Sequence, residues 1–213
     1  MKTHIIWDWN GTLLDDVNLC VRLLGDLLRH QGKSPVSKER YLEIFGFPIS
    51  EYYLRAGFDF SMESYESLAA RYMQVYPKAG CWLGPVPGVL QLTEALHRRG
   101  LHQVILSASD QQVLYRQLSY SGYPSRTFDE VLGLDNIYGV SKVERGRNWI
   151  NESGVSPADA VFIGDTVHDA ETAAAMGCDC ILVSWGHQSR AKLQTAGVRV
   201  VDTPEELLSE ILK

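Results

Sequence analysis

Residues 5–12 read Ile-Ile-Trp-Asp-Trp-Asn-Gly-Thr, and the rest of the chain is organised around them. The apolar residues at the start of this stretch are typical of a buried strand, and the Asn10-Gly11 pair is typical of a tight turn. The strand therefore delivers one carboxylate, that of Asp8, to a turn that is followed by the hydroxyl of Thr12. This placement suits a nucleophile, but it also suits a helix cap, and later parts of the chain decide between the two.

The overall composition is that of a soluble globular protein with a small-molecule partner. The 213 residues are 45% hydrophobic and 22% charged, and the formal net charge is −6 without any basic run. These values speak against a nucleic-acid or anionic-membrane surface. No segment has the length of a membrane span or the apolar core of a signal peptide, and the four cysteines lack zinc-ligand and C-x-x-C spacing. We therefore expect a cytoplasmic protein, either a monomer or a small homo-oligomer.

A helical segment follows the opening stretch. Apolar residues recur at helical spacing over residues 15–76, with breaks at glycine-containing turns and without any strand pattern. Residues 78–88 are rich in glycine and proline and form the best linker of the chain. We therefore expect a small all-helical domain over residues 15–84, inserted after the first strand of an α/β core that comprises residues 1–14 and 85–213.

Beyond this linker, helical segments alternate with apolar strands. The expected strands cover residues 102–106, 130–132, 160–163, 180–183 and 198–201. The alternation predicts a doubly wound parallel sheet with helices on both faces. In such sheets, ligands bind at the carboxyl ends of the strands. Asp8, Ser107 and Asp165 each follow an expected strand, so we expect their side chains to meet at one edge of the sheet.

Two further acids join Asp8 at this edge. Asp165 and Asp169 lie in Gly-Asp-Thr-Val-His-Asp between a strand and a helix, where their spacing directs both carboxylates toward one crevice. Neighbouring carboxylates raise one another's pKa unless a cation lies between them, and Mg²⁺ is a suitable cation for oxygen ligands. One Mg²⁺ and Lys142, at the start of an expected helix, would balance the three negative charges. Hydrogen-bond donors for a phosphate group would come from Gly11, Thr12 and Ser107.

The order of these motifs resembles that of the haloacid dehalogenase superfamily, specifically of its phosphatases. The motifs are Asp8-x-x-Gly11-Thr12, Ser107 after a strand, Lys142, and Gly164-Asp165-x-x-x-Asp169. The tail from Met176 to Gly186 also resembles the phosphoglycolate phosphatase and β-phosphoglucomutase branch, and the helical insert resembles the small helical cap of the family. The resemblance covers the whole chain and implies a Rossmann-like core and a phosphoric monoester hydrolase.

The resemblance also implies a role for each motif. Asp8 attacks the phosphorus atom of a small phosphorylated metabolite and forms an aspartyl-phosphate that water cleaves. Lys142 keeps Asp8 ionised and neutralises the phosphoryl group. The implied Mg²⁺ ligands are Asp8, Asn10 through its backbone carbonyl, Asp165 and Asp169. The implied phosphate-binding residues are Gly11, Thr12, Ser107, Ala108 and Lys142.

Asn10 departs from the family pattern, because phosphatases of the family usually carry an aspartate there that protonates the leaving oxygen. An amide cannot transfer this proton, and loss of a general acid-base costs about 10²- to 10⁴-fold in rate. Three interpretations stay open. The enzyme uses good leaving groups or another base such as His168; the protein is a slow phosphatase or a phosphate-ligand binding or regulatory protein; or an original aspartate was deliberately changed.

Other hydrolyses known for the family fit the sequence less well. A dehalogenase of this family needs no metal, whereas the pair Asp165 and Asp169 indicates one. A phosphonate-cleaving relative would need a small residue at position 10, where Asn10 stands.

Overall fold

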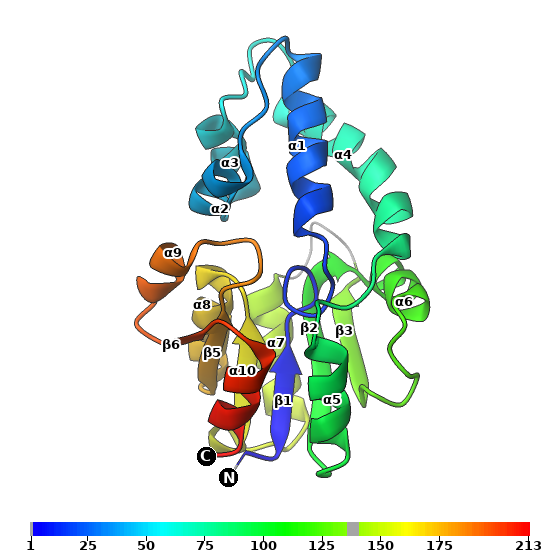
Figure 1. Cartoon of the computed structure of the whole chain (residues 1–213), viewed down its shortest axis with the longest axis vertical. Helices are drawn as coiled ribbons and strands as arrows, with labels where there is room; N and C mark the ends of the chain where they lie inside the picture. Colours follow the sequence, from blue (N-terminus) through cyan, green and yellow to red (C-terminus); the bar gives the residue numbers. More distant parts are fainter. Residues whose placement is uncertain (1, 136–140) are drawn as a thin grey trace.

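Within residues 2–135 and 141–213, which the computed structural model describes, six strands form one parallel sheet. Residue 1 and residues 136–140 of the expected core lie outside the described residues. The strands are β1 (His4–Trp7), β2 (His102–Asp110), β3 (Glu130–Leu134), β4 (Ala160–Gly164), β5 (Asp179–Val183) and β6 (Arg199–Val201). Their order is β3-β2-β1-β4-β5-β6, and every neighbouring pair is parallel (Figure 1). The predicted doubly wound parallel sheet is confirmed.

The position of β1 in the sheet creates a site for a ligand. Trp7 of β1 pairs with Ile105 of β2 on one side and with Ile163 of β4 on the other. The chain first builds the sheet from β1 toward β3 and later from β4 toward β6, so the direction of building reverses between β1 and β4. A crevice forms outside the carboxyl ends of the strands at such a reversal. Asp8 directly follows β1 and Asp165 directly follows β4.

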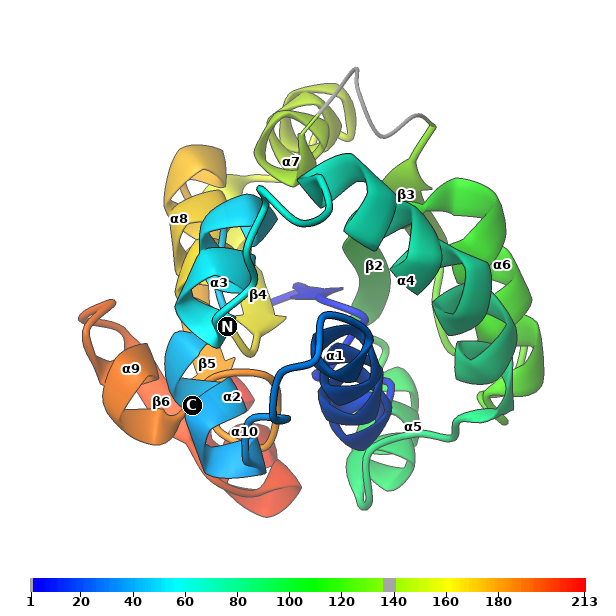
Figure 2. The same ribbon diagram turned by 90° about the horizontal axis from the view of Figure 1, so that it is seen from above.

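Alternating side chains of β1 point to opposite faces of the sheet, and a different set of helices packs on each face. Ile5 and Trp7 belong to one hydrophobic cluster, whereas Ile6 belongs to another. The helices that pack into the first cluster are α5 (Val89–His97), α6 (Gln111–Tyr120) and α10 (Pro204–Ile211). Those that pack into the second are α7 (Lys142–Glu152) and α8 (Val167–Met176). Figure 2 shows these two sets on opposite sides of the strands, so the sheet is buried on both faces.

Four more helices lie beyond the carboxyl ends of the strands (Figure 1). They are α1 (Val17–His30), α2 (Lys38–Ile44), α3 (Ile49–Ala56) and α4 (Tyr65–Ala79). Their buried side chains form a hydrophobic cluster of their own. We call these helices the helical layer. The two connections to the sheet run side by side, because the backbone N–H of Asp15 donates to the carbonyl of Gly84 at 3.0 Å.

The strand β2 is longer than the sequence predicts. The apolar pattern ends at Leu106, but the strand continues to Asp110, which pairs with Leu134 after a register irregularity. Ser107 therefore lies within β2 and does not follow it, so this expectation was wrong. The pairing of Asp110 with β3 extends the strand through the Ser-Ala-Ser-Asp segment, although the residues of this segment carry no strand pattern.

The remaining helix of the sheet layer is α9 (Arg190–Gln194), which packs Leu193 against Leu182 of β5. Across the described part of the chain, every helix is too short or too polar to cross a membrane.

Candidate active site

Three buried carboxylates and one lysine meet at the carboxyl ends of β1 and β4. Carboxylate oxygens of Asp8, Asp165 and Asp169 lie within 4.8 Å of one another. Lys142, the first residue of α7, donates one hydrogen bond to Asp8 and another of 2.6 Å to Asp169. None of the four residues is more than 7% exposed. The structure thus brings together the charged residues that the sequence predicts for the site.

Asp169 connects the start of α8 to the site. Its Oδ2 atom accepts hydrogen bonds from the backbone N–H and the hydroxyl of Thr166, at 2.9 and 2.7 Å. Its Oδ1 atom accepts from Lys142. One oxygen therefore satisfies the free donors of the helix start while the other holds the lysine. The ammonium group of Lys142 also lies 5.2 Å from the ring centre of Phe162.

Burial and crowding change the proton affinities of these groups. Burial raises the pKa of Asp8 well above its usual range, and the attraction of Lys142 offsets this only in part because Asp169 and Asp165 repel. Burial likewise raises the pKa of Asp165, to about 6. Burial alone would lower the pKa of Lys142, yet Asp169 and Asp8 raise it above the ordinary value. The lysine is therefore a cation, and it pairs with two of the three acids, Asp8 and Asp169.

The side chain of Asn10 is hydrogen-bonded both to the sheet and to the helical layer. Its Oδ1 atom accepts a hydrogen bond of 2.8 Å from the hydroxyl of Ser109 in β2. Its Nδ2 atom donates to Asp16 at 3.0 Å and lies 2.5 Å from the hydroxyl of Tyr76 in α4. The amide therefore has one orientation, with its oxygen toward the sheet and its nitrogen toward the helical layer.

Asp16 and His187 form a buried pair directly behind the turn at Gly11. The Oδ1 atom of Asp16 accepts from the backbone N–H of Gly11 at 2.8 Å and lies 3.1 Å from His187 Nε2. The backbone N–H of His187 donates to Asp165 at 2.6 Å, and its Nδ1 atom lies 2.8 Å from the Tyr41 hydroxyl. Burial alone would lower the pKa of His187, but Asp16 outweighs it and raises the pKa to about 9. Imidazolium and carboxylate therefore form an ion pair.

Sequence reasoning missed this pair. Neither Asp16 nor His187, which lies in a turn beyond β5, is among the predicted site residues. The available signals were the consecutive acids Asp15-Asp16 shortly after the turn at Gly11 and a histidine after the strand that ends at Val183. Neither signal indicates that residues 171 positions apart come into contact.

Two expected phosphate donors are used inside the protein. The hydroxyl of Thr12 donates to Asp165 at 3.0 Å, and the backbone N–H of Gly11 donates to Asp16. Both groups therefore orient acids of the site in this structure. Ser107 is 1% exposed, and its oxygen accepts from the backbone N–H of Ser109 at 3.1 Å, which leaves its own hydrogen to donate. Ala108 is exposed beside it.

His168, the candidate for a replacement base in one of the three interpretations, has other contacts. Its Nδ1 atom lies 3.0 Å from Glu171, and its ring centre lies 4.8 Å from that of Phe47. The groups in contact with the Asn10 side chain are instead Asp16, Tyr76 and Ser109.

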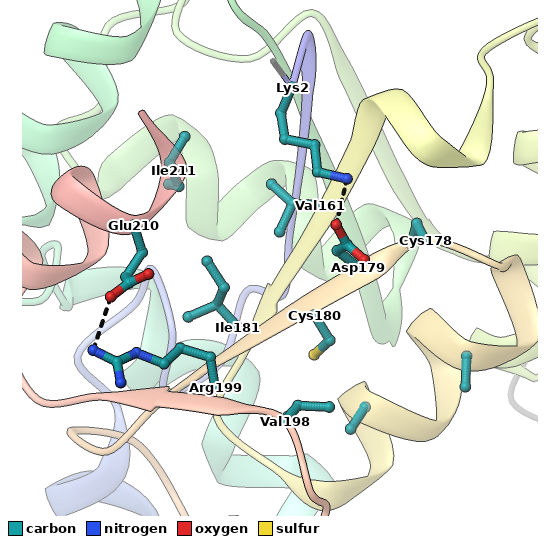
Figure 3. Close-up of a pocket in the computed structure, with 12 residues that line it drawn as sticks. Lys2, Val161, Cys178, Asp179, Cys180, Ile181, Val198, Arg199, Glu210 and Ile211 are labelled. Atoms are coloured by element: carbon teal, nitrogen blue, oxygen red, sulfur yellow. Dashed lines mark ion pairs between the residues drawn. The ribbon is translucent and has the colours of Figure 1, made fainter. Parts of the chain in front are cut away.

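A cavity of about 420 Å³ lies at the opposite end of the sheet (Figure 3). Its wall includes Asp179 and Arg199, the first residues of β5 and β6. Asp179 pairs with Lys2 at 2.6 Å, and Arg199 pairs with Glu210 at 2.8 Å. These charges already have partners, and the cavity is separate from the acids at the carboxyl ends of the strands.

Comparisons with known proteins agree with this geometry. The family description haloacid dehalogenase-like hydrolase matches residues 5–183. A phosphoglycolate phosphatase of Synechococcus elongatus is 27% identical over 208 residues, which cover 97% of this chain and 96% of the relative. Phosphoglycolate phosphatase 1 of Pseudomonas aeruginosa is 23% identical over 96% of this chain and 78% of its own length.

A crystal structure described as that of a predicted phosphatase from Clostridium acetobutylicum shares the fold. Its TM-score is 0.83 at 20% identity, over 100% of this chain and 99% of that chain. The match of the family description covers most of the sheet, the helical layer and all four charged site residues. The resemblance found in the sequence is therefore confirmed, and the chain belongs to the haloacid dehalogenase-like hydrolase family.

Proposed function

We propose that the chain is a Mg²⁺-dependent hydrolase of small phosphomonoesters, similar to phosphoglycolate phosphatases. The observation that carries this proposal is the contact of Lys142 with both Asp8 and Asp169, beside Asp165. A carboxylate held by a cation at the end of a buried strand suits attack on phosphorus. The names of the relatives support the reaction class. Membership in a hydrolase family disfavours the alternative of a phosphate-ligand binding or regulatory protein.

In the proposed reaction, a carboxylate oxygen of Asp8 attacks the phosphorus atom of the ester. The bond from phosphorus to the ester oxygen breaks, and its electron pair leaves with that oxygen. Water then attacks the phosphorus of the aspartyl-phosphate, which releases phosphate and restores the Asp8 carboxylate, and the proton that this water loses balances the proton that the ester oxygen takes up from solvent. Lys142 orients Asp8 and neutralises charge on the transferring group. Ser107 and Ala108, at the same edge of the sheet, would bind phosphate oxygens.

The acid cluster fits a hard divalent cation. Three carboxylates lie within 4.8 Å of one another beside one ammonium group. Burial is the main cause of the raised pKa of Asp8 and of Asp165, and repulsion from Asp169 adds to it, so a cation between the three acids would be favoured. The residues that would hold Mg²⁺ are Asp8, Asn10 through its backbone carbonyl, Asp165 and Asp169. Bound Mg²⁺ would supply charge neutralisation at the phosphoryl oxygens.

We further propose that the helical layer is a cap domain. Residues 15–84 would form this cap, and residues 1–14 and 85–213 would form the catalytic core. The separate hydrophobic cluster of the helical layer supports this division. A cap beyond the carboxyl ends of the strands would exclude water from a small phosphorylated metabolite during phosphoryl transfer.

A phosphate-release assay tests the proposal. The purified chain is assayed with Mg²⁺ against a panel of small phosphomonoesters that includes phosphoglycolate. We expect release from at least one of them, loss of release with a chelator, and loss in Asp8→Asn. Asp26→Asn, an exposed acid paired with Arg29, is the matched control and keeps full activity. Absence of release across the panel from a folded protein would refute the hydrolase assignment.

A further inference from the structure

The amide of Asn10 is fully used inside the protein. Its oxygen accepts from Ser109, and its nitrogen donates to Asp16 and contacts the hydroxyl of Tyr76. An aspartate at this position would lack the donor that faces Asp16. The amide therefore has a hydrogen-bond partner for each of its polar atoms. An asparagine that had merely replaced a catalytic aspartate would not need such partners.

The partner of this amide is a carboxylate that accepts hydrogen bonds from four N–H and O–H donors and a weak one from the thiol of Cys20 at 3.6 Å. One oxygen of Asp16 accepts from Gly11 and His187, and the other accepts from Asn10 and from the Tyr76 hydroxyl at 2.6 Å. Asp16 is 1% exposed. Such a carboxylate is stable in the interior only because every oxygen has charged or polar donors.

The same contacts connect the turn that carries Asp8 to the helical layer. Gly11 lies three residues after Asp8 in this turn. Tyr76 comes from α4, and His187 contacts the hydroxyl of Tyr41 from α2. Two separate helices are thus hydrogen-bonded, through Asp16 and His187, to the loop of the proposed nucleophile.

We propose that Asn10 and Asp16 form one positioning unit, in which the amide at position 10 and the carboxylate at position 16 fix the catalytic turn and join it to the helical layer. The inference deepens the proposed function and rests on it for its activity measurement. Neither side chain acts on the substrate in this role; both act through the position of Asp8.

The unit needs one amide and one carboxylate. The two groups can exchange positions, but two carboxylates or two amides do not fit. Asn10→Asp places a second carboxylate 3.0 Å from Asp16, where the two charges repel. Asp16→Asn turns one accepting oxygen into a donor, so that Gly11 or Asn10 loses an acceptor, and it also removes the charged partner of His187. The double variant Asn10→Asp/Asp16→Asn restores one carboxylate, one amide and a hydrogen bond between them.

A double-variant cycle tests the unit. The unchanged chain, both single variants and the exchanged variant are compared by thermal unfolding and by steady-state phosphate release with Mg²⁺. Each single change is expected to lower the unfolding midpoint by on the order of 10 °C, and the exchanged variant loses clearly less than the sum of the two, because the repulsion is gone while the ion pair with His187 stays lost. Each single change lowers kcat by on the order of 10²-fold with little change in KM, since the nucleophile is misplaced while substrate binding is kept. The exchanged variant recovers kcat.

Asp15→Asn is the matched control, because Asp15 is the exposed neighbour of Asp16 and carries the same charge. It leaves the midpoint and kcat unchanged. Additive losses of the midpoint in the exchanged variant would overturn the proposal. So would an Asn10→Asp chain that keeps its midpoint and gains activity, as a simple restored general acid would. If the unchanged chain releases no phosphate, the hydrolase assignment fails, and the midpoints alone still decide whether the two residues act as a unit.

Discussion

The ion pair of His187 with Asp16 makes stability depend on pH. His187 is 4% exposed and faces Asp16, Asp165, Asp8 and the Tyr41 hydroxyl. Burial opposes its protonation, but Asp16 raises the pKa from 6.5 to about 9. Because the folded-state pKa lies above the unfolded one, the bound proton favours folding. This contribution of about 3 kcal/mol is complete below the unfolded pKa and is lost as the pH rises through the folded pKa.

We therefore predict a falling free energy of unfolding between pH 6.5 and 9. Denaturant unfolding in metal-free buffer measures it across this range. His187→Gln should flatten the profile, whereas His97→Gln, an exposed histidine of α5, should keep the profile of the unchanged chain. An equal slope in His187→Gln and the unchanged chain would contradict the assignment.

The buried charge that Asp8 needs for its proposed role lowers the stability of the folded state. Burial raises its pKa, which means that the folded state disfavours its charged form at neutral pH. Asp8→Asn removes this charge, and Lys142 retains its contact with Asp169. We predict that the unfolding midpoint rises by about 2–4 °C without metal, while phosphate release falls by at least about 10³-fold. A lower midpoint or a retained rate would show that Asp8 is a structural acid.

Single site residues were predictable where a strand end or a local sequence motif indicated them. Asp8 and Asp165 follow buried strands, and Lys142 and Asp169 lie at helix starts where a cation or an acid is informative. The pair of Asp16 and His187 was not predictable, because its geometry depends on how the turn beyond β5 meets the turn after β1. No local pattern encodes such a contact.

At the scale of elements, the carboxyl end of α2 is the point where the helical layer meets the turn and helix after β5. The backbone N–H of Ser189 donates to the carbonyl of Leu42 at 3.0 Å, and Gln188 donates to that of Phe45 at 3.0 Å. The ammonium group of Lys192 donates to the carbonyl of Phe45 at 2.6 Å. A cation at a helix C-terminus satisfies carbonyls that have no partner within the helix.

Lys192→Met is therefore predicted to loosen α2. Hydrogen exchange of residues 38–56 should accelerate by about fivefold, which corresponds to the loss of a cation at a helix end. Exchange in β1 and β4 should not change. Lys78→Met, an exposed lysine of α4, is the control and should leave every segment unchanged. Unchanged exchange of residues 38–56 in Lys192→Met would show that this contact does not hold α2.

The element pattern was largely predictable, because periodicity and turn residues are local. Each predicted strand is present, and the breaks in the helical segment fall between α2, α3 and α4 as expected. The end of β2 was not predictable from its own residues, since pairing with Leu134 extends the strand to Asp110. Such an extension depends on a neighbouring strand that lies about 25 residues further along the chain.

At the scale of the whole molecule, the helical layer and the sheet have separate hydrophobic clusters, which explains why one chain has two layers. The helical layer buries its aromatic residues in its own cluster, and the sheet buries Trp7 and Trp9 in another. Composition and periodicity predicted this separation. How the layers face each other was not predictable, because it depends on buried polar contacts such as Tyr76 with Asp16.

Binding of Mg²⁺ at the acid cluster, as proposed, would couple metal binding to the stability of the whole chain. Bound Mg²⁺ would stabilise the folded state by about 2.7 kcal/mol at a hundredfold excess over its dissociation constant. We predict a midpoint rise of about 5–10 °C at pH 7.5. Burial raises the pKa of Asp165 from 3.8 to about 6, so the metal-free protein gains stability as the pH falls through this range while protons displace the metal.

The effect of Mg²⁺ on the midpoint should therefore be clearly smaller at pH 5 than at pH 7.5. Scanning fluorimetry with Mg²⁺ or with a chelator at both pH values measures this difference. Asp165→Asn should abolish the Mg²⁺ effect, whereas Asp179→Asn, which removes an acid at the other end of the sheet, should retain it. An equal rise at both pH values, or a full rise in Asp165→Asn, would show that these carboxylates do not bind the ion.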